Sequence, residues 1–340
     1  MRLAIIIISL FIIPTVVVAQ DFHFTQYDKS LMITNPATVG NFEGFERISI
    51  QNRNQWIGAG TKFITTMTSA EFTIGKSGHQ NKAFGGIGLF FMNDAGGDSK
   101  FGMTCGGLSI SGNIPLARGH RLSAGLQTSF NNRNADFSNL SFYSQWNGSI
   151  FDPTIAVDEP NQLASFSYLD AGMGVNYSFD KSRKGSSSRE QTINIGAFIQ
   201  HINQPKLRYN ALAVDHLYSK YGFHVESAFG LSSNMSVELK VAQFIQGKHY
   251  EGLYGAFYKM KFKGASQITR LKNDNTLSAG LYYRSTGAII PACYVDFGNY
   301  RFGVSYDQEL GRIAAAYRSS LEFSFSFTTM KKSIFKGKRL

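Results

Sequence analysis

The chain has 340 residues, a formal net charge of +11 at pH 7, 14% aromatic residues, 34 glycines and only 17% charged residues. Few charges with many aromatic residues and glycines argue against a soluble enzyme. They are typical of a membrane β-barrel, because half of each strand in such a barrel faces lipid. A basic chain often binds nucleic acid. Here the basic residues match no nucleic-acid motif and the first residues predict export, so we expect no nucleic acid as a partner.

Residues 1–19 predict a secretory signal peptide. Arg2 supplies a positive charge, residues 4–18 form a short apolar run, and Ala19 offers a small residue for cleavage. The run is shorter than the roughly 20 residues that a membrane helix needs, and Pro14 would break it. A retained anchor is the alternative. No cysteine follows the apolar run, so a lipoprotein signal is not predicted.

Residues 20–44 are too irregular for a strand and too aromatic for a free tail. Their aromatic residues include Phe22, Phe24, Tyr27 and Phe42. The pair Asn35-Pro36 favours a turn. We expect this segment to fold into the lumen of the barrel as a small plug. A periplasmic peptide that binds a partner is the alternative.

The dominant period between residues 45 and 328 is two, which predicts strands. From 168 to 179, polar or small residues such as Asn176 alternate with apolar ones such as Val175. The runs are about 10 to 15 residues long, whereas strands in soluble proteins average about 5 to 6. Their polar face is rich in Ser, Thr, Asn, Gln and Gly, as in a wetted or plugged lumen. The sequence therefore predicts an all-β fold, a transmembrane, antiparallel, up-and-down outer-membrane β-barrel.

We expect about 14 strands, and single-chain bacterial barrels have an even number. The predicted strands are 45–57, 60–75, 82–93, 101–114, 119–132, 166–181, 190–203, 217–231, 234–246, 249–262, 274–287, 288–297, 299–308 and 318–328. With both ends of the barrel chain in the periplasm, the longest connection, 133–165, falls outside the cell, where long loops belong. Residues 329–340 then form a basic periplasmic tail.

The positive charge gathers at one predicted rim. On this topology the inner turns and the tail carry 17 Lys and Arg residues against three acidic residues. Lys181, Arg183 and Lys184 are the candidate partner-binding residues of this basic rim. We expect them to dock an acidic periplasmic partner by electrostatic complementarity. The alternative is that such residues only keep turns soluble or contact lipid headgroups.

The sequence predicts no catalytic residue, no cofactor and no metal site. Residues 70–77 nearly match a phosphate-binding loop, but Ala70 replaces the first glycine and no helix follows. The chain has no G-x-S-x-G or H-E-x-x-H motif. His224 and Glu226 share one face of a strand, where a lumen-lining polar pair is favoured over a catalytic one. We therefore expect no enzyme.

Two further patterns lie inside the predicted strands. The glycines at 85–88 and 106–107 resemble a glycine-rich loop, but in a barrel strand they allow bending and close approach, so we expect no ligand there. Cys105 and Cys293 are far apart in apolar runs. Buried thiols are therefore favoured over a disulfide, which requires Cα atoms within about 7 Å.

Two parts of the mature chain carry a specific motif. The matching amino-terminal positions are Gln20, Asp21, Phe24, Thr25, Gln26, Tyr27, Asn35, Pro36, Ala37, Gly40, Arg53, Asn54, Gln55 and Trp56. Near the carboxyl end, residues 294–297 (YVDF) and 301–307 (RFGVSYD) precede a last strand. Together they resemble the PorP/SprF family of type IX secretion system outer-membrane proteins. Thr25 stands where the family usually has Ser, and the basic tail extends beyond the usual aromatic end.

The resemblance implies an outer-membrane component of the type IX secretion or gliding motility apparatus of a Gram-negative bacterium. Such a component supports export or surface anchoring of secreted proteins or adhesins by binding partners. The implied partners are periplasmic lipoproteins or peptidoglycan-linked secretion subunits and a large surface adhesin, besides membrane lipids. The composition leaves open a passive outer-membrane channel or hydrophobic-compound transporter, because it also needs a polar lumen. A barrel lipid hydrolase is the third possibility and lacks the context of a nucleophile.

Overall fold

The computed structural model describes most of the region that was predicted to form the barrel. The described residues are 23–57, 63–76, 82–97, 101–135, 141–155, 165–181, 191–208, 215–262, 275–310, 319–330 and 333. The predicted signal peptide and most of the predicted basic tail lie outside these residues.

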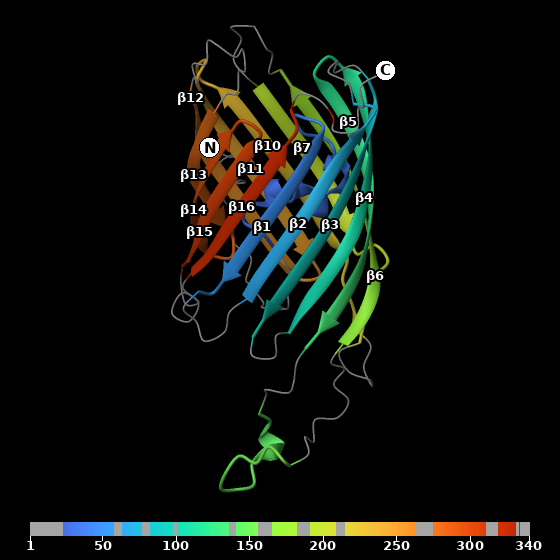
Figure 1. Cartoon of the computed structure of the whole chain (residues 1–340), viewed down its shortest axis with the longest axis vertical. Coiled ribbons are helices and arrows are strands. Elements are labelled where there is room, and N and C mark those ends of the chain that lie inside the picture. The colour runs from blue at the N-terminus through green and yellow to red at the C-terminus, as the bar shows by residue number, and fades with distance from the viewer. Residues whose placement is uncertain are drawn as a thin grey trace, which may run out of the picture.

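The described strands form a closed antiparallel barrel in which β1 pairs with both β2 and β16 (Figure 1). Its strands are β1 (Glu46–Gln55), β2 (Phe63–Ile74), β3 (Phe84–Gly96), β4 (Phe101–Ala117), β5 (His120–Asn134), β6 (Ser165–Asp180), β7 (Gln191–Gln200), β10 (Lys220–Gly230), β11 (Met235–Gln246), β12 (His249–Phe262), β13 (Asn275–Arg284), β14 (Ala288–Phe297), β15 (Tyr300–Glu309) and β16 (Ser319–Thr328). The predicted fold class and the predicted number of 14 strands are confirmed within the described part of the chain.

The long connections contain further short elements. β8 (Lys206–Leu207) and β9 (Asp215–His216) pair with each other as a separate two-stranded sheet between β7 and β10. The 3₁₀ helix η3 (Tyr143–Gln145) lies in the connection from β5 to β6, beyond the end of the barrel at which β1 ends. No helix in the described part of the chain is long and apolar enough to cross a membrane.

Alternate side chains of each strand point outward and into the lumen. On β6, Leu169 is 64% exposed and Val175 is 53% exposed, whereas Tyr168 and Asn176 are buried. The outer face is thus apolar and suited to lipid, and the inner face carries the polar residues. Tight hairpins join several strands. Gly119 and Gly298 adopt φ values of +84° and +63° in two of these turns, a conformation that glycine adopts without steric cost.

The two ends of the barrel differ. We call the end at which β1 begins and β16 ends the terminus end, which is uppermost in Figure 1. The opposite end, which carries the long β5–β6 connection, is the loop end. On the predicted topology the terminus end faces the periplasm.

Residues 23–45, here called the plug, lie inside the barrel (Figure 1). The plug contains the 3₁₀ helix η1 (Tyr27–Lys29), the short helix α2 (Leu31–Thr34) and the 3₁₀ helix η2 (Pro36–Thr38). It runs from His23, which lies 3.8 Å from Glu251 near the loop end, to residue 45 at the terminus end. Two apolar clusters fill the space between plug and wall, one around Met32 and one around Tyr27.

Candidate functional site

Four charged side chains of the barrel wall meet inside the lumen, toward the loop end. They are Arg53 of β1, Arg284 of β13, Asp307 of β15 and Glu322 of β16, each at most 3% exposed. Arg53 Nη2 lies 2.8 Å from Asp307 Oδ2, and Arg53 Nη1 lies 3.2 Å from Glu322 Oε2. Arg284 Nη2 lies 2.7 Å from the same Asp307 oxygen. Two cations thus face two anions, which offsets the large free-energy cost of burying an isolated charge.

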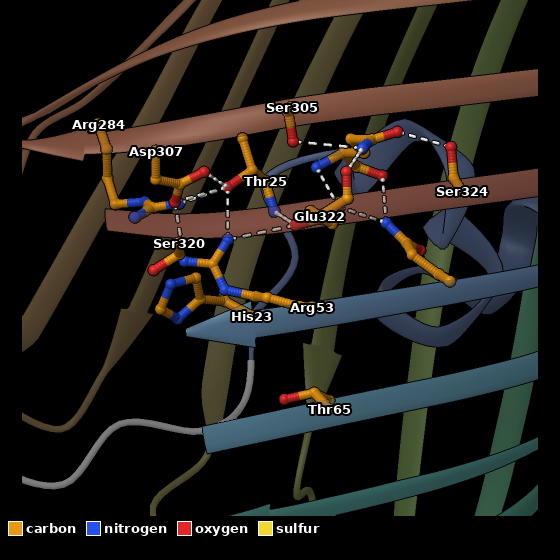
Figure 2. A network of polar contacts seen from close by, with 12 residues as sticks. His23, Thr25, Arg53, Thr65, Arg284, Ser305, Asp307, Ser320, Glu322 and Ser324 are labelled. Atoms are coloured by element: carbon orange, nitrogen blue, oxygen red, sulfur yellow. Dashed lines mark hydrogen bonds and ion pairs between the residues drawn. The ribbon is translucent and has the colours of Figure 1, made fainter. Parts of the chain in front are cut away.

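The plug completes this four-residue charge network, as Figure 2 shows around Thr25. The Glu322 carboxylate accepts hydrogen bonds from the backbone N–H groups of Thr25 and Gln26, at 2.8 and 2.9 Å. The Thr25 hydroxyl oxygen accepts from Arg53 at 2.8 Å and from Arg284 at 2.5 Å. Because Thr keeps the hydroxyl of the Ser that the family motif usually has, the departure at Thr25 preserves this contact.

Gln26 connects the plug to both sides of the seam where β1 meets β16. Its carbonyl oxygen accepts a hydrogen bond from Gln51 of β1 at 3.1 Å. Its side-chain amide donates to Ser305 of β15 at 3.2 Å and to the Glu322 carbonyl of β16 at 3.1 Å. Its Oε1 accepts from Ser324 at 2.6 Å. One residue, through its backbone carbonyl and its side chain, thereby ties together the first strand and the last two strands of the barrel.

The Asn35-Pro36-Ala37 turn lies inside the lumen against β5, β6 and β7. Asn35 begins η2 with a side chain that accepts from the Ala37 N–H at 3.1 Å, and Pro36 fills the first helical position, where no N–H is needed. The Asn35 amide also donates to the Val175 carbonyl at 3.1 Å and lies 3.1 Å from His224 Nε2. The side chain thus both caps the turn and fixes it to the wall.

The wall provides room for this turn through glycines on neighbouring strands. A Cβ atom on Gly125 of β5 would overlap the Pro36 backbone, and one on Gly174 of β6 would overlap the Asn35 side chain. Gly125 and Gly174 are direct cross-strand partners. They form a flat area without side chains on which the plug backbone rests, which is the close approach expected of strand glycines.

A third anchor holds the plug at the terminus end. Lys76, in the turn after β2, donates to the carbonyl oxygens of Gly40 and Phe42 at 3.0 and 2.5 Å. The Phe42 ring has Arg47 4.3 Å and Lys76 5.0 Å from its centroid, a favourable arrangement for a cation and an aromatic face. Burial lowers the pKa of Lys76 to about 7, and the positive charges of Arg121 and Arg47 act in the same direction.

The predicted partner-binding residues are only partly described. Lys181 is exposed just after the end of β6, at the terminus end, and its backbone N–H donates to the Gln191 carbonyl at 2.9 Å. Arg183 and Lys184 lie outside the described residues. Lys181 is therefore open to contact by a partner.

The other residues considered from the sequence take structural places. His224 contacts Asn35 of the plug, and Glu226 accepts a hydrogen bond from Asn194 at 3.4 Å. Cys105 on β4 and Cys293 on β14 form no disulfide. Within the described residues, no group of three or more His, Cys, Asp and Glu side chains could hold a metal ion.

The charge network itself was not predicted from the sequence. Arg53 and Asp307 belong to the motifs that carry the family resemblance, and Glu322 occupies a polar position in the alternation of the last strand. Ionisable residues on the lumen face of membrane strands are the signal that could have indicated it, because such groups require partners.

Comparisons with known proteins place the chain in a family. The solved barrel structures that are similar include the monoaromatic hydrocarbon channel CymD, with 11% identity, TM-score 0.47, and coverage of 88% of this chain and 92% of the other. The Pseudomonas putida toluene transporter TodX has 11% identity, TM-score 0.46, and coverage of 88% and 93%. The translocator domain of the autotransporter NalP from Neisseria meningitidis has 11% identity, TM-score 0.42, and coverage of 89% and 96%. No curated protein sequence matches the chain. The model of the type IX secretion system membrane protein PorP/SprF family matches residues 16–327, so the expected resemblance is confirmed and the chain belongs to this family.

Proposed function

We propose that this protein is an outer-membrane component of the type IX secretion or gliding motility apparatus of a Gram-negative bacterium. It supports export or surface anchoring of secreted proteins or adhesins by binding partners, and it performs no chemistry. The observation that carries this proposal is the family match over residues 16–327, combined with a barrel whose lumen is occupied by its own plug.

The plug favours a binding role over that of a passive channel. Tyr27, Met32 and Ala37 of the plug are each at most 2% exposed, and three separate anchors hold the plug in the lumen. A passive outer-membrane channel or hydrophobic-compound transporter, the second candidate, needs a continuous path through the lumen. In the described conformation the plug occupies that space, so the surfaces left for function are the two ends of the barrel and its outer face.

The two ends suit different partners. The terminus end carries the exposed Lys181 of the predicted basic rim, which favours acidic periplasmic lipoproteins or peptidoglycan-linked secretion subunits through charge complementarity. The loop end carries the connection from β5 to β6, where Tyr143 is 89% exposed and Ile150 is 63% exposed. Trp146 and Phe151 of the same connection are exposed as well, and exposed apolar side chains that cluster in this way favour contact with proteins. A large surface adhesin is the partner proposed there.

The test is affinity purification of the tagged protein from its native envelope in mild detergent, with mass spectrometry of the proteins that accompany it. An equally abundant, tagged barrel without a secretion role serves as the control. Enrichment of periplasmic secretion subunits or of a large adhesin over this control supports the proposal. A protein recovered without partners, together with stable single-channel conductance of the unmodified chain, would overturn it in favour of the channel.

A further inference from the structure

Two cavities lie inside the lumen on opposite sides of η1. The first, of about 50 Å³, is lined on the loop-end side by His23, Phe24, Tyr27, Lys220, Phe244 and Glu251, among others. The second, of about 180 Å³, is lined on the terminus-end side by Asp28, Lys29, Glu226, Glu238, Lys240 and Arg301, among others. Of the three residues of η1, Tyr27 lines the first cavity, and Asp28 and Lys29 line the second.

Both cavities are bounded in part by β10, β11 and β12. The loop-end cavity uses Lys220 of β10 and Phe244 of β11, and the terminus-end cavity uses Glu226 of β10 and Lys240 of β11. Phe244 and Lys240 are separated by four residues along β11, or about 13 Å at the usual rise of a strand. The cavities therefore lie one above the other in the sector of β10, β11 and β12, with a short barrier between them.

The barrier consists of η1 and the apolar side chains around it. Tyr27 is 2% exposed, and its hydroxyl donates to the Val241 carbonyl at 3.2 Å. Next to Tyr27, the buried residues Ala242 and Leu253 of the wall belong to the same apolar cluster. On the side of the larger cavity, the Lys240 ammonium donates to the Asp28 carboxylate at 2.7 Å. Tyr282 of β13 also donates to the Asp28 carboxylate at 3.3 Å, and the rings of Phe257, Tyr282 and Tyr294 complete the apolar cluster. The barrier therefore consists of η1 packed against the wall.

The firm anchors of the plug are elsewhere. Thr25 and Gln26 bind β1, β13, β15 and β16, and the turn from Asn35 to Ala37 rests on β5, β6 and β7. η1 spans the gap between these anchors and has a single 3₁₀ turn, a form with weaker internal hydrogen bonds than an α-helix. A local shift of η1 therefore does not require release of either anchor.

We infer that η1 is a gate, and that its displacement from β10–β12 joins the two cavities into a conduit for small inorganic ions across the plugged barrel. Apart from histidine, the lining of the two cavities includes Lys29, Lys220, Lys240, Lys259 and Arg301 against Asp28, Glu226, Glu238, Glu251 and Asp296. With five residues of each sign, the conduit favours neither cations nor anions strongly.

The test measures ion conductance of the full-length purified protein in planar bilayers with KCl. The variant Tyr27→Ala removes the ring from the barrier, and we expect conductance events at least tenfold more frequent than in the unmodified protein, with a reversal potential near zero in a KCl gradient. Tyr221→Ala, which removes the same ring from the exposed outer face of β10, is the matched control and stays at the unmodified level. Deletion of residues 23–40 is the conducting reference.

A second measurement locates the current. Ala228 lines the terminus-end cavity, so Ala228→Cys in the Tyr27→Ala background should make the current sensitive to block by a charged thiol reagent. The same reagent on Tyr27→Ala alone controls for Cys105 and Cys293. The inference would be overturned if Tyr27→Ala were as silent as Tyr221→Ala while the deletion conducts. A current that the reagent does not block at position 228 would overturn it as well.

Discussion

Arg53 and Asp307 form an ion pair 2.8 Å long inside the lumen, and they join β1 to β15 across the strand β16 that lies between them. The two side chains are 1% and 0% exposed, so solvent and salt screen the attraction between their charges only weakly. Thr25 of the plug accepts a hydrogen bond from Arg53 and donates one to Asp307. Closure of the barrel at its seam and insertion of the plug are therefore linked through the same few atoms.

Removal of one member of this network should be costly. Arg53→Met leaves Glu322 buried with one charged partner fewer, and loss of one partner of a buried pair typically costs about 3 kcal/mol or more. We expect the urea midpoint of the detergent-solubilised variant to fall accordingly, as followed by the loss of the compact band on unheated gels. Arg118→Gln, a change at an exposed position in the β4–β5 turn, should shift stability by no more than about 0.5 kcal/mol. Equal midpoints for the two variants would contradict the role assigned to the network.

The two wall glycines on which the plug rests, Gly125 and Gly174, give a second prediction. Gly174→Ala places a methyl group where the Asn35 side chain lies, so the turn must move away from the wall. Because the Lys29 side chain is only 9% exposed, trypsin should spare it in the unmodified barrel and cut it in the variant, as detected by mass spectrometry. The matched control is Gly112→Ala on β4, where an added Cβ meets no atom within 4 Å. Cleavage at Lys29 in the control, or protection of Lys29 in both variants, would contradict the role of Gly174 in holding the plug.

The strands could be predicted from the sequence because their signal is local. The alternation over 249–262 and 288–297 matches β12 and β14 at both edges, since an apolar outer face and a polar lumen face require period two. The expected strand 217–231 begins later, at Lys220, and Asp215 and His216 just before it pair with β8. Such a departure depends on contacts outside the strand, and the alternation of polar and apolar residues carries no information about those contacts.

The functional site could not be predicted in the same way, because its contacts are distant in sequence. Thr25 and Glu322 are 297 positions apart, and alternation shows only that Glu322 faces the lumen. Which lumen residues meet depends on the tilt and stagger of the strands when the barrel closes. The glycines of 85–88 were expected to allow close approach, and a Cβ on Gly86 would in fact lie 2.5 Å from the Val39 carbonyl oxygen. The sequence could not indicate that the neighbour would be the plug.

The terminus-end anchor should make stability depend on pH. The folded protein holds the pKa of Lys76 at about 7, whereas the ordinary value is 10.5. Between these values the unfolded chain binds a proton that the folded chain does not, so the contribution of Lys76 to the free energy of unfolding rises with pH from about 7 to 10.5. Below pH 7 both states bind the proton and this contribution is flat. Lys76→Met lacks this titration.

The measurement for Lys76 is the urea midpoint at intervals between pH 6 and pH 10. The difference between the unmodified protein and Lys76→Met should grow in favour of the unmodified protein as the pH rises above 7. Ile74→Met, at an exposed apolar position at the end of β2 that carries no titratable group, should keep the slope of the unmodified protein. Parallel curves for the unmodified protein and Lys76→Met would show that the anchor does not titrate in this range.

The basic rim gives the last prediction, which concerns partners. Reversal of charge at Lys181, Arg183 and Lys184 to Glu should weaken binding of an acidic periplasmic partner, because attraction becomes repulsion at three positions. With a typical contribution of up to about 1 kcal/mol for each exposed pair, the total for three pairs reaches at most about 3 kcal/mol, or roughly a hundredfold in affinity. Salt should reduce the difference, since exposed charges are screened.

The matched control for the rim reverses Lys206, Arg208 and Lys248, which are exposed near the opposite, loop end of the barrel. This control changes the net charge by the same amount and leaves the terminus end intact. Recovery of periplasmic partners by affinity purification should fall for the rim variant and stay constant for the control. If both variants recover equal amounts, the basic residues at the terminus end serve solubility or lipid contact instead, and the partner must recognise another part of that end.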